Sequence, residues 1–177
     1  QERIDESIIG ITNKKQGRTV LPPQRVGVGK DNKELRATSF TSCVNDFVGN
    51  HDKIAMSLNS QKSLVVFVIK KNVSVLQKLH KWLKDQNLDP VKGYIDIPML
   101  LVDDEADNAS VNTKKDETDP TKTNKLIRQI CTLFKDTTYV GFTATPFANV
   151  FIDPDSVDSM KNADLFPEHF RYALEAP

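Results

Sequence analysis

Four carboxylates within five positions follow a short apolar run near the middle of the chain. The run covers residues 99–102, and Asp103, Asp104, Glu105 and Asp107 come directly after it. Placing like charges this close together costs electrostatic repulsion and partial desolvation, and a bound cation relieves both. The residue types and their spacing therefore point to a cation site. A solvated acidic turn or a helix start is the alternative, because Asp is favoured near helix N-termini.

The apolar run indicates where these carboxylates would lie. A continuous run of residues 99–102 predicts a strand buried on both faces, as in a parallel sheet. Open α/β sheets bind their ligands at the carboxyl ends of such strands. We therefore expect the acidic residues at the ligand-binding edge of a sheet.

A second polar motif follows another apolar segment. Thr143, Thr145 and Pro146 come directly after residues 137–142, which we predict to be a strand of the same sheet. Short hydroxyl side chains at that edge can hydrogen-bond an acid on the neighbouring strand and sense a γ-phosphate. The alternative is an ordinary turn after a strand, with Thr present for its β propensity and Pro as a break.

Apolar periodicity predicts three strands and two helices in the central part of the chain. Strands alternating with helices are typical of a parallel sheet with right-handed crossovers. The predicted strands cover residues 63–69, 98–102 and 137–142, and the predicted helices cover residues 73–83 and 126–134. At the start, Ile4, Ile8 and Ile9 predict a short helix ended by Gly10. Residues 37–60 are ambiguous, although four of them are spaced like one helical face, namely Cys43, Val44, Phe47 and Val48.

Composition excludes several function classes. The 177 residues contain 24 Lys plus Arg and 24 Asp plus Glu, so nucleic-acid contacts must come from local patches and not from a global field. The longest apolar stretch, Leu64–Ile69, is far too short to cross a membrane. No signal-peptide pattern is present, so we expect a cytoplasmic protein. Cys43 and Cys131 match no metal-ligand spacing and are expected to be reduced, buried thiols.

The two motifs together resemble a known family. An Asp-Glu-Ala-Asp sequence followed by Thr-Ala-Thr is similar to motifs II and III of superfamily-two helicases. More narrowly, residues 101–107 and 139–151 resemble the Z-one domain, a family described as an endonuclease domain that occurs with helicase-type ATPases in bacterial restriction or defence systems. The resemblance extends from Ser63 to about Phe166.

This resemblance implies a fold class and a division of the chain. The implied fold is α/β, a partial RecA-like, P-loop NTPase three-layer domain with a mainly parallel sheet. Within one domain, the division is an N-terminal part (1–62), a βαβαβ core (63–152) and a surface extension (153–177).

The resemblance also implies roles for individual residues. Asp104 would be the Walker B acid at a magnesium ion, and Glu105 the catalytic base. Asp107, Thr143 and Thr145 would bind the nucleotide and couple its state to motion. The implied cofactors are Mg²⁺ and ATP, and the implied partners are DNA and other lobes or subunits of a restriction or defence system.

One element of such an ATPase site is missing from the sequence. The nearest match to a Walker A loop, residues 25–31, has Gln24 where the first Gly should stand and Asp31 where Ser or Thr must reach magnesium. We therefore reject it as a phosphate-binding loop. Because the chain opens without Met inside a predicted helix, we expect a fragment whose Walker A loop and arginine finger lie elsewhere. Alone, it is predicted to be inactive.

Two other function classes stay open at this stage. The first is a metal-dependent endonuclease using the acidic cluster, although the only acid-x-Lys sequence, Asp31-Asn32-Lys33, lies in an unpatterned loop. The second is a non-catalytic lobe that binds DNA or protein. Several lysines could contact phosphate backbones, but the neutral total favours an ordinary solvated face. These lysines are Lys70, Lys71, Lys78, Lys81 and Lys84.

Overall fold

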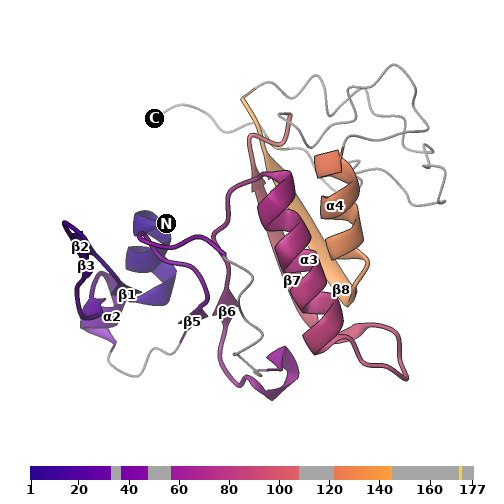
Figure 1. Cartoon of the computed structure of the whole chain (residues 1–177), viewed down its shortest axis with the longest axis horizontal. Coiled ribbons are helices and arrows are strands. Elements are labelled where there is room, and N and C mark those ends of the chain that lie inside the picture. Colours follow the sequence, from indigo (N-terminus) through magenta and orange to yellow (C-terminus); the bar gives the residue numbers. More distant parts are fainter. Residues whose placement is uncertain (33–36, 48–56, 108–121, 145–171, 173–177) are drawn as a thin grey trace. The chain divides into compact units, whose positions relative to one another are not determined.

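A computed structural model describes most of the chain (Figure 1). The described residues are 1–32, 37–47, 57–107, 122–144 and 172.

The chain divides into two compact units. The first unit is Gln1–Leu88 and the second is Asp89–Pro177. The division falls inside segment 63–152, which the sequence predicted as one core, and the predicted segment boundaries stay a prediction. We describe each unit by itself.

The first unit opens with a short helix. α1 (Glu2–Ile4) continues into the π-helix η1 (Asp5–Ile9). Gly10 ends this helix in a left-handed conformation with φ 76°, and its N–H donates to the carbonyl of Asp5 at 2.6 Å. Glycine adopts this conformation without strain and is therefore common at helix ends. The predicted helix and its end at Gly10 are confirmed.

Short strands follow in the first unit. β1 (Ile11–Thr12) pairs antiparallel with β4 (Gln24–Arg25), β2 (Lys15–Gln16) pairs antiparallel with β3 (Thr19–Val20), and β5 (Thr38–Ser39) pairs parallel with β6 (Val65–Val66). Two one-turn helices, α2 (Val28–Asp31) and η3 (Leu58–Ser60), connect them. The strand predicted over residues 63–69 is thus shorter than expected.

The helical face predicted over residues 43–48 is wrong in its described part. Ser42 and Asn45 form an isolated bridge, and each backbone N–H donates to the other's carbonyl. The apolar spacing has another cause, because Phe47 is 1% exposed and packs its ring against other aromatic rings. Residue 48 lies outside the described residues.

An aromatic cluster forms the core of the first unit together with α3 (Val73–Asn87). The rings of Phe67 and Trp82 lie 5.8 Å apart between centroids, and the rings of Phe40 and Phe47 each lie 5.2–5.9 Å from both of them. The side chain of Asn72 accepts a hydrogen bond from the N–H of Val75 at 2.9 Å, which caps the helix N-terminus. The predicted helix is confirmed, with Leu76, Leu79, Trp82 and Leu83 among its buried residues.

The second unit contains the two longest strands. β7 (Ile95–Asp104) and β8 (Phe134–Phe142) pair in parallel. The segment that connects them includes α4 (Lys122–Cys131), which Figure 1 shows beside β8. In their register Asp103 lies opposite Gly141 and Asp104 opposite Phe142. The chain is thus mixed α/β with small parallel sheets, as predicted at this coarse level. The prediction of one parallel sheet with all three strands is wrong for the described residues, because β6 pairs with β5 and β7 pairs with β8 in separate two-stranded sheets.

The prediction that the central strand is buried on both faces is wrong. Buried or half-buried residues alternate with exposed ones along β7, and Leu100 and Val102 are 65% and 56% exposed. Phe142, at the end of β8, is 47% exposed. Successive side chains of a strand point to opposite faces, so the apolar run supplies only every second residue to the covered face.

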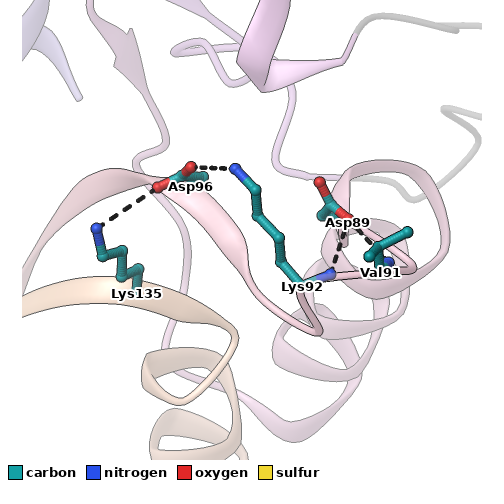
Figure 2. Close-up of polar contacts among 5 residues, drawn as sticks. All are labelled: Asp89, Val91, Lys92, Asp96 and Lys135. Atoms are coloured by element: carbon teal, nitrogen blue, oxygen red, sulfur yellow. Dashed lines mark hydrogen bonds and ion pairs between the residues drawn. The ribbon is translucent and has the colours of Figure 1, made fainter.

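Charged side chains stabilise the start of β7 (Figure 2). The carboxylate of Asp89 accepts hydrogen bonds from the N–H groups of Val91 and Lys92 at 2.8 and 2.9 Å. These two N–H groups hold the pKa of Asp89 below its usual value. Asp96 forms an ion pair with Lys92 and lies 4.0 Å from Lys135 of β8. This cluster lies at the end of β7 opposite to the acidic motif.

Within the described ranges, no helix has the length and apolar character needed to cross a membrane.

Candidate functional site

The acidic turn, which we define as residues Asp103–Asp107, begins at the carboxyl end of β7. The strand ends at Asp104, and the chain then turns beside the end of β8. The N–H of Ala106 donates to the carbonyl of Phe142 at 2.9 Å, and the Ala106 side chain is buried. The last residue pair of the two strands is Asp104 with Phe142, so the bond from Ala106 holds the turn against β8 just beyond the end of the paired region.

Strand geometry separates the first two carboxylates. Asp103 is 5% exposed, and its Oδ2 accepts a hydrogen bond from the hydroxyl of Tyr139 at 2.8 Å. Asp104 is exposed, because consecutive residues of a strand face opposite sides of the sheet. Of these two acids only Asp104 is accessible to a ligand from solvent.

Glu105 has an unusual backbone conformation. Its φ is +52°, the only positive φ outside glycine among the described residues. For a residue with a Cβ this left-handed conformation costs about 1–2 kcal/mol. Its N–H donates to Oδ1 of Asp104 at 3.1 Å, and its side chain is exposed. Strain of this kind is typical of functional sites, where the surrounding structure maintains it.

The two polar motifs meet at this edge of the sheet. The hydroxyl of Thr143 donates to Oδ1 of Asp107 at 2.5 Å. Thr143 directly follows β8, so the sequence prediction of a hydrogen bond between a hydroxyl and an acid on the neighbouring strand is confirmed for this pair. Thr145, predicted to act beside it, lies outside the described residues. The roles of these residues toward a nucleotide stay a prediction.

Sequence reasoning missed the contribution of Tyr139. Asp103 had no assigned role, whereas the structure gives it a phenol partner on the covered face of the sheet. The parallel register indicates that Tyr139 and Asp103 can meet. Gly141 lies opposite Asp103, and Tyr139 lies two residues before Gly141 on the same strand. Two residues along a strand return to the same face.

The free thiol of Cys131, at the end of α4, lies near the same buried carboxylate. Burial raises the pKa of Cys131 to about 11, and the charge of Asp103 acts in the same direction. Cys131 is partly exposed as a whole residue, and Cys43 is exposed. The prediction of buried thiols is therefore wrong for Cys43, whose Sγ instead lies 3.3 Å from the buried carboxylate of Asp5.

Close packing explains the glycines of the rejected Walker A match. A Cβ on Gly27 would lie 2.0 Å from the carbonyl oxygen of Glu6, and one on Gly29 would lie 1.9 Å from that of Gly10. Only glycine allows the two backbones to approach this closely. The Gly-x-Gly spacing therefore serves the packing of α2 against η1 and its end, which supports the rejection.

The acidic turn presents a small set of carboxylates for a ligand. Asp104 and Glu105 are exposed side by side, and Asp107 is bonded to Thr143. No group of three or more His, Cys, Asp or Glu side chains in the described part of the chain is arranged to hold a metal ion. An exposed Asp and Glu at this edge can bind a cation whose other ligands are water molecules or phosphate oxygens. A carboxylate there can also accept a proton from water.

Comparisons with known proteins were made at three levels. Neither family models, nor curated proteins, nor solved structures give a match to this chain.

Proposed function

We propose that this chain supplies the Mg-ATP hydrolysis edge of a helicase-like ATPase with a RecA-like lobe, related to the Z-one domain family. The observation that carries the proposal is the hydrogen bond from Thr143 to Asp107. It joins the Asp-Glu-Ala-Asp sequence and the Thr-Ala-Thr sequence at the carboxyl ends of two paired parallel strands. α/β folds with parallel sheets bind nucleotides at this edge.

The residues at the edge fit the chemistry of such a site. Asp104 would hold the magnesium ion, and Asp107 with Thr143 and Thr145 would contact the nucleotide. A bound magnesium ion supplies charge stabilisation for phosphoryl transfer when it is present. Glu105 is exposed next to Asp104 and would orient the attacking water and accept its proton. The left-handed backbone of Glu105, which the surrounding structure maintains, would set the direction of its side chain before the ligand arrives.

The partners are proposed from the family resemblance alone, which is an inference by analogy and not from the chemistry of the site. They are DNA and the other lobes or subunits of a bacterial restriction or defence system. The Walker A loop and the arginine finger would come from other parts of the complete protein.

Steady-state ATP hydrolysis by the complete protein, with and without DNA, tests this proposal. Glu105→Gln removes the base and keeps the side-chain size, so we expect turnover to fall by at least about a hundredfold while ATP still binds. Glu2→Gln, the same change at an exposed residue of α1, is the matched control and should leave turnover unchanged. Undiminished turnover in Glu105→Gln would refute the assignment. The chain alone should not turn over ATP.

The endonuclease alternative receives less support from the geometry. A cleaving metal site needs several acids that converge, whereas Asp103 and Asp104 face opposite sides of the sheet. Plasmid nicking by the chain with Mg²⁺, lost in Asp104→Ala, would favour this alternative over ATP hydrolysis.

The exposed apolar residues of the β7–β8 sheet favour a second candidate, an interaction lobe without catalysis. Leu100, Val102 and Phe142 expose their side chains on this sheet. Exposed apolar groups that cluster are typical of binding surfaces. A complete protein that binds its partner but not ATP would favour this candidate.

A further inference from the structure

We infer that Tyr139 and Gly141 are positioning residues that hold the acidic turn in its working geometry through Asp103 and Ala106. The inference rests on the proposed function, since it assigns how Asp104 and Glu105 are kept in place for that reaction. It concerns two residues of β8 to which the sequence patterns gave no role.

A hydrogen bond joins Tyr139 of β8 to Asp103 of β7. The phenol hydroxyl donates to Oδ2 of Asp103 at 2.8 Å, on the covered face of the sheet. Asp103 directly precedes Asp104, so fixing its side chain also fixes which face of the strand Asp104 takes. A hydrogen bond to a carboxylate is stronger than one between neutral groups and holds its partners in a narrower range of geometries.

Gly141 has no side chain at a point where β8 lies close to Tyr139 and Ala106. A Cβ at position 141 would lie 3.5 Å from Cε1 and 3.6 Å from the hydroxyl of Tyr139, so the phenol ring extends past this glycine toward Asp103. The same Cβ would lie only 2.9 Å from Cβ of Ala106. Gly141 is therefore the point at which β8 contacts both the start and the middle of the acidic turn.

A backbone hydrogen bond lies next to this close contact. The N–H of Ala106 donates to the carbonyl of Phe142, the residue after Gly141. Glu105, with its left-handed backbone, lies between the two anchored residues Asp103 and Ala106. Anchors on both sides are what a strained residue needs in order to stay in its conformation.

Stability alone does not account for a buried carboxylate at position 103. Burying a carboxylate costs free energy, and an apolar pair of similar size in place of a buried polar pair is often at least as stable. The neighbouring Cys131 cannot offset the buried charge, because a thiol is neutral when protonated and negative when ionised. A defined orientation of the following residues is what the polar pair provides and an apolar pair would not.

Hydrogen–deuterium exchange of single amides, followed by NMR in this chain, tests the positioning without any assay of activity. In Tyr139→Phe we expect the protection of the Ala106 amide to fall by about tenfold, the effect of losing one hydrogen bond to a carboxylate. The Ile95 amide, which donates to the carbonyl of Leu133 at the other end of the sheet, should change by less than about twofold. Equal losses at both amides, or no loss at Ala106, would overturn the inference.

Kinetics of the complete ATPase tests the consequence. Tyr139→Phe should lower kcat by about tenfold and leave KM for Mg-ATP within about twofold, because the base is misplaced while the nucleotide still binds. The double variant Asp103→Asn, Tyr139→Phe should lower kcat no further than the more severe of the two single variants, because both changes remove the same hydrogen bond. Tyr94→Phe, at the residue before β7, is the matched control. Gly141→Ala should reproduce the kcat loss if it folds.

The outcomes separate the two proposals. If Glu105→Gln abolishes turnover while Tyr139→Phe turns over like the wild type, the positioning role falls and the proposed function stands. If the complete protein does not hydrolyse ATP, or Glu105→Gln has no effect, the proposed function falls. In that case the exchange of the Ala106 amide still decides whether Tyr139 positions the turn.

Discussion

Thr143 donates a hydrogen bond from Oγ1 to Oδ1 of Asp107, and this bond connects the residue after β8 to the last acid after β7. The two residues are 36 positions apart in the sequence. Only the parallel pairing of β7 with β8 brings them together. The bond therefore reports directly on whether the two motifs form one site.

Replacing this hydroxyl should weaken the second unit. Thr143→Val keeps the shape of the side chain but removes the donor, and we expect a loss of about 1–2 kcal/mol in the free energy of unfolding. Thr143→Ser keeps the donor and should lose less. Denaturant titration measures the change, with Thr138→Val at an exposed position of β8 as the control. Equal stability of Thr143→Val and the wild type would show that the bond does not persist in solution.

The left-handed backbone at Glu105 predicts that this residue costs the protein stability while its side chain serves the proposed reaction. Glu105→Gly removes the cost of placing a Cβ at φ +52°, but glycine loses more backbone entropy on folding. We therefore expect the free energy of unfolding to be unchanged or up to about 1 kcal/mol higher. Glu105→Val should destabilise, because β-branched residues tolerate this conformation poorly. Thermal unfolding of the variants measures both effects. A clearly destabilised Glu105→Gly would mean that the residue is not strained.

The contact between Gly141 and Ala106 predicts a mutation that its neighbour can rescue. Gly141→Ala places a Cβ 2.9 Å from that of Ala106 and should destabilise by about 1–3 kcal/mol through overpacking. Ala106→Gly removes the opposing atom, so the double variant should be more stable than the sum of the two single effects. A double-mutant cycle in urea measures this coupling. Strict additivity would contradict the contact.

The charged cluster at the start of β7 predicts a pH dependence. The pKa of Asp96 is lowered by its bond to Lys92, and that of Asp89 by the N–H groups of Lys92 and Val91. Since both folded-state pKa values lie below the ordinary 3.8, their stabilisation is present above that value and is lost as the pH falls below it.

Lys92→Met should reduce this acid sensitivity by removing the ammonium partner of Asp96. Urea midpoints measured between pH about 6 and about 2 should converge for wild type and variant at the acid end. Lys78→Met, at an exposed position of α3, serves as the control and should leave the pH profile unchanged. High salt should shrink the difference between Lys92→Met and wild type, because the pair is exposed. A constant difference at all pH values would contradict this assignment.

Local patterns in the sequence predicted most of the regular elements. The apolar spacing of α3 and α4 and the β-branched and apolar segments of β7 and β8 are properties of short stretches, and each element formed near the predicted position. Phe134, predicted as the last residue of the second helix, is instead the first residue of β8, because α4 ends at Cys131. The end of the first helix at Gly10 is equally local, because it depends on the residue type that adopts a left-handed backbone without strain. The meeting of the two polar motifs also followed from the sequence, once the strands were taken as parallel.

Other features depended on neighbours that no local pattern names. The spacing around Phe47 suggested a helix, but aromatic rings brought together from distant segments decided its conformation. The exposure of Leu100 and Val102 is likewise a matter of which face of the sheet is covered.

The sequence by itself determined which residues of this protein could do chemistry, because acids and hydroxyls at strand ends are fixed by residue type and order. The tertiary structure alone decided how they are held. It gave Asp103 a partner in Tyr139, set the left-handed backbone of Glu105, and placed Gly141 against Ala106. These relationships require two strands to lie in one register, and a register is a property of the folded sheet and not of either strand.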